Sequence, residues 1–318
     1  MSEYKSVFAA DLQEYLSIRR MTFMPDTLRI DEHTLGDFDA FLAEQGVTEK
    51  TVSEKVINGW IAHLKTKNHS RTVSSKVSTL RCFLKYLRYS GISVFMPQCP
   101  KYHEDYVPYI FTDAEMESIF KSADETDFQL AMLIRLLYGC GLRHGETRNL
   151  VRSDADFVRG TLLMRHAKNK KQRIVPMHKS LNETLMQYCV AIKIYDKPDA
   201  LLFPGATDDK AQSQQVMMSK FRAVLQTANV YMPTQKPYQR GQCLHCLRHV
   251  FAVKSFAQSE QNGRLGLDSA PYLSVYLGHF DMDGTEKYLK FSSDIFPEHT
   301  QMFENYSSGI FTEIGGAE

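Results

Sequence analysis

Several features that would assign the chain to a familiar class are scarce in its sequence. Its 318 residues include only 6 cysteines, and they are scattered, which argues against the disulfide framework of a small secreted protein. No stretch approaches the roughly 18 uninterrupted apolar residues of a membrane span, because the best candidate, LAMLIRLLYGC, contains Arg135. The N-terminus is acidic and amphipathic, so we expect no signal peptide and a cytoplasmic protein with reduced thiols.

Net charge is also low, at +1, and by itself indicates nothing about nucleic acid. The charges are nevertheless unevenly distributed. Residues 1–49 carry four basic and ten acidic side chains, whereas residues 50–90 carry nine basic side chains and a single acid, Glu54. A second basic segment, MRHAKNKKQR at 164–173, contains five Lys or Arg and no acid. Such patches can mark phosphate contacts, although a solvated helix face and a charged hairpin tip would give the same pattern.

The first part of the chain, residues 1–92, has the apolar periodicity of a helical bundle. Helices are predicted near 7–20, 34–46, 51–67 and 71–89, the third opening with a capping box formed by Thr51 and Glu54. The last helix has an apolar face and a basic flank. This flank supplies candidate DNA contacts, namely Arg71, Lys76, Arg81, Lys85 and Arg88.

The second part of the chain, residues 111–318, follows a linker at 93–110 that is rich in proline and keeps no helical period. It opens with a capping box at Thr112 and Glu115, and an almost wholly apolar segment at 128–141 predicts a buried central helix. The period then changes to that of strands, and DADFV, TLLMRH and QRIVPM predict a three-stranded antiparallel sheet. Helices are predicted near 179–194, 211–229, 243–257, 267–277 and 284–290. The expected fold is mainly α with one small sheet.

The densest group of chemically active side chains is the segment GQCLHCLRHVFAVK at 241–254. Its cysteines and histidines suggest zinc, but on a helix they face different sides, and no second pair elsewhere completes four ligands. His245 and Arg248, in contrast, lie one turn apart on the same side of the helix. An imidazole beside a guanidinium suits a phosphate, although a surface pair would have the same spacing.

Other segments carry residues of similar chemistry. GLRHGE places Arg143 just after the buried helix with Glu146 able to support it, and Lys168 lies near the tip of the predicted hairpin. VYLGHFDMDGTEKYLKF contains His279 and, nine residues later, Tyr288. Each has an ordinary structural explanation: a capping pair, a solvated lysine, a helix C-cap and a core tyrosine. Together they would require several independent coincidences.

The order Arg143, Lys168, His245, Arg248, His279, Tyr288 resembles the tyrosine recombinase (phage integrase) family. GLRxxE, a hairpin lysine followed by RIVP, HxLRH, LGH and a tyrosine nine residues after that histidine are its signatures. The resemblance covers about 111–291, and residues 1–92 are similar, more weakly, to the family's SAM-like core-site DNA-binding domain. One departure is Cys246, where the family usually has an acidic or polar residue.

The resemblance implies a site-specific recombinase that cuts and rejoins double-stranded DNA through a 3′-phosphotyrosine on Tyr288. Arg143 and Arg248 would bind the phosphate, His245 and His279 would assist, and Lys168 would protonate the departing 5′-hydroxyl. Neither ATP nor a metal is needed, and the sequence contains no P-loop and no paired carboxylates, so no cofactor is expected. A homotetramer on two DNA sites, with the tail at 295–311 on a neighbouring protomer, is also implied. Additional DNA contacts are expected from the hairpin: Lys170, Lys171 and Arg173.

Two rival interpretations fit the same residues. A type IB topoisomerase-like enzyme would use the same covalent step to relax supercoils without exchanging strands between sites. A helical DNA-binding regulator with vestigial catalytic residues would bind without cutting, but every expected catalytic position is filled. The DNA target and the biological role cannot be derived from the sequence.

Overall fold

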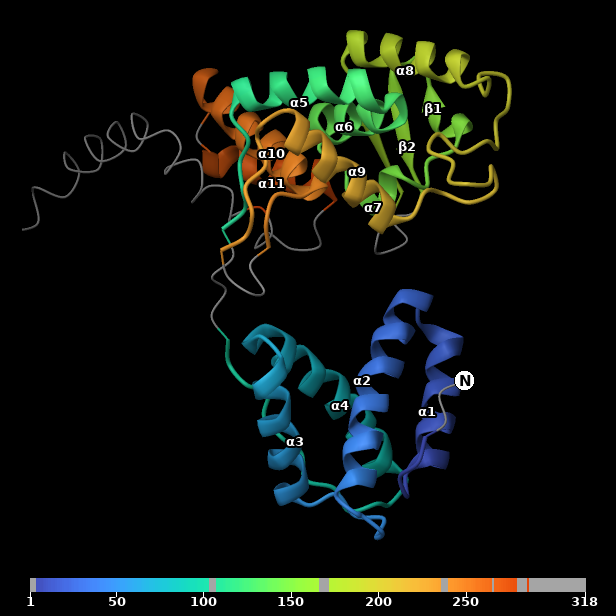
Figure 1. The fold of residues 1–318 in the computed structure, drawn as a ribbon, viewed down its shortest axis with the longest axis vertical. Helices are drawn as coiled ribbons and strands as arrows, with labels where there is room; N and C mark the ends of the chain where they lie inside the picture. The colour runs from blue at the N-terminus through green and yellow to red at the C-terminus, as the bar shows by residue number, and fades with distance from the viewer. Residues whose placement is uncertain are drawn as a thin grey trace, which may run out of the picture. The chain divides into compact units, whose positions relative to one another are not determined.

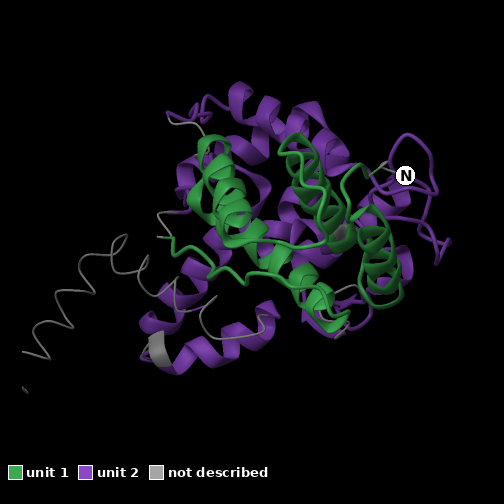
Figure 2. Ribbon diagram, turned by 90° about the horizontal axis from the view of Figure 1, so that it is seen from below, with its two compact units in different colours: residues 1–106 green, residues 107–318 purple. Residues whose placement is uncertain are grey.

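The computed structural model describes residues 4–102, 107–165, 172–235, 240–264 and 266–278, together with Thr285. The chain divides into two compact units, residues 1–106 and 107–318 (Figure 2). The described residues form eleven α-helices and one small antiparallel sheet (Figure 1), which confirms the mainly-α fold class. None of these helices is long and apolar enough to cross a lipid bilayer.

The first unit is a four-helix bundle made of α1 (Ala9–Thr22), α2 (Pro25–Glu44), α3 (Glu54–Lys67) and α4 (Ser70–Tyr89). Apolar side chains at three- and four-residue spacing turn inward from every helix, because this spacing gathers them on one face. The rings of Phe38 and Trp60, both fully buried, meet edge to face with centroids 5.2 Å apart. A parallel bridge between Val52 and Val94 joins the segment before α3 to the segment after α4.

Two helix starts in this unit differ from the sequence prediction. α2 begins at Pro25, nine residues before the predicted start at 34. Its first two turns are largely exposed, so they show no apolar periodicity, while proline at the first helical position favours a start there. The predicted capping box at Thr51 is wrong, because Ser53 is the N-cap of α3 and its side chain accepts a hydrogen bond from the Val56 backbone N–H.

The second unit is organised around α6 (Phe128–Cys140), which is apolar on nearly every side and packs against α5 (Asp113–Thr126), α8 (Lys179–Ala191), α9 (Gln214–Thr227) and α10 (Leu244–Gln261). α11 (Gly266–Leu277) packs on α10. The capping box predicted at Thr112 and Glu115 is present at the start of α5. The buried central helix is therefore as the sequence predicts.

The sheet of this unit has the strand order β1-β2-β3, with β1 (Ala155–Asp156), β2 (Thr161–Met164) and β3 (Arg173–Pro176) all antiparallel. Pairing of Leu162 with Val175 places both side chains in the core, whereas Met164 is opposite Arg173. This confirms the predicted three-stranded sheet. The short helix α7 (His144–Thr147) and a 3₁₀ turn at Arg152–Asp154 connect α6 to β1.

Candidate active site

The end of α6 positions the first candidate catalytic residue. Gly141 ends the helix in the left-handed region, with φ of 59°, which glycine adopts without steric cost. A Cβ at this position would lie 2.3 Å from the Phe251 ring on α10, so the close approach of the two helices also requires glycine. Two residues later, Arg143 is the N-cap residue of α7. The GLR sequence thus turns the chain sharply and places an arginine at the edge of the core.

A buried carboxylate connects Arg143 to the sheet. Glu146 Oε1 accepts a hydrogen bond of 2.9 Å from Arg143 Nη1, and its Oε2 accepts one of 2.7 Å from Arg173 Nη2 at the start of β3. Burial would by itself raise the pKa of Glu146, but hydrogen bonds and positive charge from Arg173 and Arg143 outweigh it and hold that pKa below its usual value. Glu146 is therefore ionised at neutral pH and fixes the direction of both guanidinium groups.

Arg173 was predicted as a DNA contact from the basic hairpin sequence, and the structure places it inside the unit. Its side chain is 13% exposed, and its Nε and Nη1 have no hydrogen-bond partner within the described part of the chain. Nη1 lies beside Gly278, where a Cβ would come within 3.1 Å of it. A role in DNA binding stays a prediction for Arg173, and its observed partner is Glu146.

Arg248 enters the same region from α10. It is only 1% exposed and donates from Nη1 to the carbonyl oxygen of Gly141 and from Nη2 to that of Leu277, both at 2.7 Å. Arg143 Nη2 donates to the carbonyl oxygen of Gly278, also at 2.7 Å. Two guanidinium groups that are far apart in the sequence thus bind consecutive carbonyls at the end of α11. The residue that follows these carbonyls is His279.

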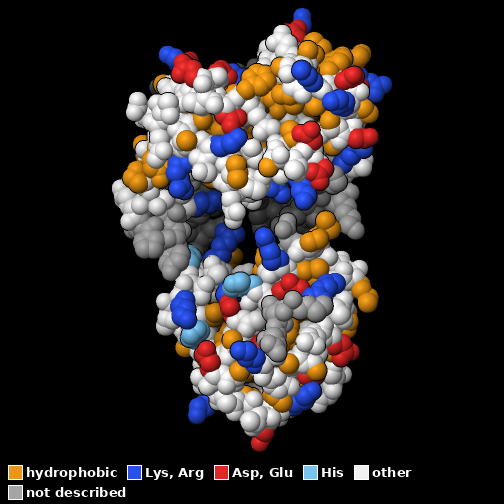
Figure 3. Space-filling model, turned by 45° about the vertical axis from the view of Figure 1, so that its right-hand side comes forward, with side chains coloured by type: hydrophobic (Ala, Val, Ile, Leu, Met, Phe, Trp, Pro, Cys, Tyr) orange, Lys and Arg blue, Asp and Glu red, His pale blue; other side chains and the backbone are white. Residues whose placement is uncertain are grey.

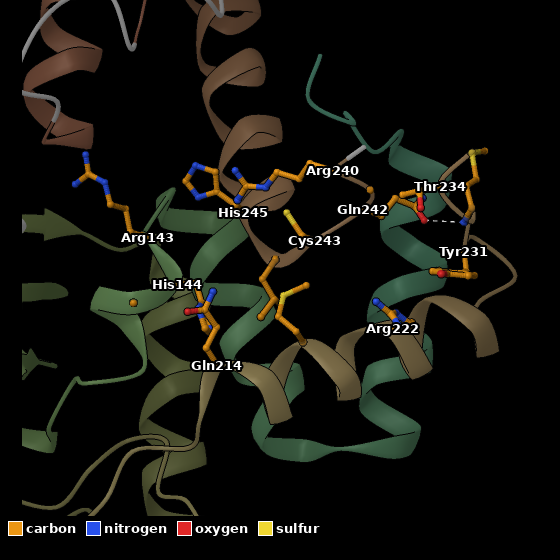
Figure 4. A pocket seen from close by; sticks show the side chains of 15 residues that line it. Arg143, His144, Gln214, Arg222, Tyr231, Thr234, Arg240, Gln242, Cys243 and His245 are labelled. Carbon is orange, nitrogen blue, oxygen red and sulfur yellow. Dashed lines mark hydrogen bonds between the residues drawn. The ribbon is translucent and has the colours of Figure 1, made fainter. Parts of the chain in front are cut away.

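His245 lies one turn before Arg248 on α10, as the helical spacing predicts. Its ring meets the ring of His249 edge to face, with centroids 4.6 Å apart, and it is partly exposed. His245 and Arg143 both line a cavity of about 540 Å³. In Figure 4 the side chains of Arg143, His245 and Arg240 follow one another along the same edge of this cavity. The structure therefore brings Arg143, His245 and Arg248 together.

The cavity also contains basic residues that sequence reasoning missed. Arg240 precedes α10 and Arg222 projects from α9, and both line the cavity with Tyr231 (Figure 4). Neither belongs to a motif, so their place beside Arg143 depends on how α9 and α10 pack. The only available signal was that Arg240 lies five residues before His245 in the sequence.

Five candidate residues lie outside the described part of the chain. They are Lys168, Lys170 and Lys171 of the hairpin tip, His279 and Tyr288. The helix predicted at 284–290 lies outside it apart from Thr285, and the tail at 295–311 lies wholly outside it. Among the residues that the structure does describe, no three His, Cys, Asp or Glu side chains are grouped as metal ligands.

The other candidate DNA contacts are on α4, in the first unit, and several already have partners there. Lys76 forms an ion pair of 2.5 Å with Asp37, Arg81 donates to the carbonyl of Pro97, and Arg88 donates to that of Val94 at 3.3 Å. The Arg71 guanidinium lies 5.9 Å from the centroid of the Tyr102 ring. Lys85 is exposed.

Charge is distributed over the visible surface without one dominant sign. Lys and Arg side chains, in blue, are interspersed with Asp and Glu side chains, in red, on both units in Figure 3. This agrees with the net charge of +1.

The fold is a helical unit followed by a mainly-α unit with converging arginines and a histidine, and comparisons with known proteins identify the family. Residues 110–292 match the phage integrase family, and residues 10–91 match the phage integrase N-terminal SAM-like domain. The chain belongs to the phage integrase family. It is a tyrosine-type site-specific recombinase, as the sequence motifs predicted.

Its relatives extend over nearly the whole chain. An integrase/recombinase of Sinorhizobium fredii, y4rB, is 27% identical over 324 residues, which cover 94% of this chain and 98% of that protein. Tyrosine recombinase XerC of Staphylococcus aureus is 27% identical over 280 residues, covering 85% of this chain and 88% of XerC.

Solved structures share the fold at lower identity. A lambda integrase dimer bound to a COC′ core site superposes with a TM-score of 0.65 at 15% identity, covering 88% of this chain and 94% of that one. XerH recombinase bound to a palindromic difH substrate, in a post-cleavage complex, gives a TM-score of 0.65 at 16% identity, covering 92% of this chain and 84% of that one.

Proposed function

We propose that the enzyme cuts and rejoins double-stranded DNA through Tyr288, with the scissile phosphate bound by Arg143 and Arg248. The observation that carries this proposal is the convergence of these two arginines on Leu277 and Gly278. A phosphate near both guanidinium groups would lie close to His279, the next residue, and beside the cavity that His245 lines. Tyr288 follows nine residues after His279, so the nucleophile is tethered to the phosphate-binding end of α11.

The chemistry depends on making a weak nucleophile effective. A tyrosine hydroxyl has a pKa of about 10 and is mostly protonated at neutral pH. Guanidinium groups around the phosphate favour the phenolate and stabilise the negative charge that develops on the phosphoryl oxygens. Arginine is suited to this because its planar fork can donate to two oxygens at once. His245 and His279 would act as further donors, or His245 as a base.

The covalent step conserves the energy of the broken bond. The Tyr288 hydroxyl gives up its proton, for which His245 is the candidate base, and its oxygen forms a bond to phosphorus while the bond from phosphorus to the 5′ oxygen breaks. Lys168 gives a proton to that leaving oxygen. The product is a 3′-phosphotyrosine and a free 5′-hydroxyl. Attack by a 5′-hydroxyl, from the same or another strand, reverses the step and releases the tyrosine. No nucleotide hydrolysis is required.

We further propose the domain roles and the assembly. Residues 1–92 would bind the core DNA site through exposed basic side chains of α4, residues 93–110 would be the linker, and residues 111–318 would carry out catalysis. Lys170 and Lys171 would contact the DNA backbone from the hairpin. The active assembly would be a homotetramer on two DNA sites in the cytoplasm, with residues 295–311 contacting a neighbouring protomer.

A nicked suicide substrate tests the central proposal. In such DNA the fragment carrying the 5′-hydroxyl diffuses away after cleavage, so a covalent protein–DNA adduct accumulates. Wild type should give an adduct that survives SDS and maps to the peptide containing Tyr288. Tyr288→Phe removes one oxygen and keeps the ring, so it should bind DNA normally and form no adduct. An adduct at Tyr272 or Tyr276 would refute the assignment, and no adduct under active conditions would favour a vestigial regulator.

A further inference from the structure

Two cysteines surround His245 at the beginning of α10. Cys243 is the N-cap residue and Cys246 lies in the first turn of the helix. Their sulfur atoms are 3.7 Å apart, and the backbone N–H of Cys243 donates to Cys246 Sγ at 3.4 Å. A disulfide requires about 2.05 Å between the sulfurs, so the two need approach by only about 1.7 Å. The Cys-x-x-Cys spacing at a helix start supports such a closure within one turn.

The two thiols differ in access and reactivity. Cys243 lines the cavity beside Arg240, whereas Cys246 is fully buried. A hydrogen bond from the Cys246 thiol lowers the pKa of Cys243, and the charge of Arg240 acts in the same direction. The positive end of an eighteen-residue helix also favours a thiolate at its N-cap. Cys243 is therefore placed to react first, and Cys246 to react with the product.

We propose that Cys243 and Cys246 form an oxidisable dithiol site whose substrate is hydrogen peroxide. The Cys243 thiolate attacks one peroxide oxygen, the O–O bond breaks, and the hydroxide that leaves takes up a proton to become water. The sulfur of Cys246, on losing its proton, then attacks the resulting Cys243 sulfenic acid, the S–O bond breaks, and a second water is released. Two thiols and one peroxide thus give one disulfide and two waters. A reduced dithiol such as dithiothreitol reverses the oxidation by exchange.

Oxidation would change the geometry of the active site. Closing the sulfur–sulfur gap draws together the two residues on either side of Leu244 and His245, so the histidine moves with the first turn of α10. Displacements of about 1 Å at a reacting centre can slow a reaction on the order of 100-fold. DNA cleavage should accordingly be about 10- to 100-fold slower in the disulfide form. This consequence depends on the proposed role of His245, whereas formation of the disulfide does not.

The sequence provides a direct assay for the bond itself. Trypsin cleaves after Arg240 and Arg248, so both cysteines fall in one peptide, GQCLHCLR. After treatment of the full-length protein with hydrogen peroxide, this peptide should be lighter by two hydrogen atoms, and dithiothreitol should restore its mass. Cys246→Ser should instead retain a sulfenic acid on Cys243 that dimedone traps. An unchanged peptide under conditions that oxidise the exposed Cys82 and Cys99 would overturn the proposal.

Cleavage is measured on the same samples with the suicide substrate. The rate of adduct formation should fall as the disulfide forms and recover on reduction, while Cys246→Ser under mild peroxide should lose much less activity. A double variant, Cys82→Ser with Cys99→Ser, should behave as wild type, because these exposed thiols are not part of the site. Full activity with the disulfide complete would refute the effect on His245. If the reduced protein forms no adduct, the recombinase proposal fails. The mass of the peptide still shows whether Cys243 and Cys246 form a disulfide.

Discussion

Replacing Glu146 by Gln should destabilise the catalytic unit and weaken catalysis more than DNA binding. The change keeps the shape and one oxygen acceptor of the side chain but removes the negative charge shared by Arg143 and Arg173. Removing one partner of a buried ion pair costs about 3–5 kcal/mol. Arg143 is one quarter exposed and can recruit water, so we expect a loss of about 2–4 kcal/mol, mainly from stranding Arg173.

The difference in stability between wild type and Glu146→Gln should depend on pH. The pKa of Glu146 is lowered in the folded protein, so its stabilising effect is complete above the ordinary glutamate pKa of about 4.3. The effect is lost as the pH falls through the lower, folded pKa, because the protonated carboxyl no longer pairs with the guanidinium groups. Wild type and Glu146→Gln should therefore differ most near neutral pH and converge in acid.

Calorimetric unfolding and single-turnover cleavage of the suicide substrate measure the two effects. The matched control is Glu183→Gln, because Glu183 forms an exposed pair, 3.9 Å from Lys179, and such pairs contribute about 0–1 kcal/mol. In Glu146→Gln the cleavage rate at saturating DNA should drop at least about tenfold while the affinity changes little, because Arg143 loses its orientation. If the two variants unfold and cleave alike, Glu146 does not position Arg143.

Three further predictions concern other parts of the chain. Lys85→Ala should weaken DNA binding and flatten its salt dependence by up to about 0.9 log units per lost phosphate contact, and an unchanged salt slope would show that this lysine is only solvated. Arg81→Ala should in addition lower the stability of the first unit, because the partner of Arg81 is a backbone carbonyl. Gly141→Ala should cost at least about 1–3 kcal/mol in the free energy of unfolding, since it combines a positive φ with a clash against Phe251, and a neutral effect would contradict the described turn. Truncation after Phe291 should spare binding to one DNA site and impair pairing of two sites, and a truncated protein that recombines at the full rate would exclude a role for the tail in assembly.

Much of the fold could be predicted from the sequence because its signals are local. Thr112 and Glu115 form their capping box within four residues, and residues 161–164 of the alternating segment pair with residues 173–176 of the next one along the chain. The start of α2 could not be predicted in this way, because its first turns bury no apolar face. The N-cap of α3 is Ser53 and not Thr51. Both residue types can cap a helix, and only the backbone conformation determines which of the two does so.

The sequence predicted which residues form the candidate site better than it predicted how they are arranged. Motif spacing placed His245 and Arg248 on one side of a helix, but the partners of Arg248 are carbonyls 107 and 29 residues away in the sequence. Arg173 was grouped with the hairpin lysines by composition, yet the register of β3 turns it toward Glu146. Long side chains such as arginine can reach several neighbours, so only the packing of distant helices determines which one they bind.

If Arg143 and Arg248 bind the scissile phosphate as proposed, the carbonyl groups at the end of α11 would couple DNA binding thermodynamically to the position of that helix. Arg143 and Arg248 each use an Nη2 donor to bind Gly278 or Leu277, and a bound phosphate would draw on the same guanidinium groups. Coupling of this kind is reciprocal. If attachment of α11 to the two arginines changes their affinity for phosphate by some factor, phosphate binding changes the equilibrium constant of that attachment by the same factor. Substitutions at Ala270 or Leu273, where α11 packs on α10, would thus alter DNA affinity from a distance. On the proposed phosphate-binding roles, packing in the interior would help to set the strength with which this enzyme binds DNA.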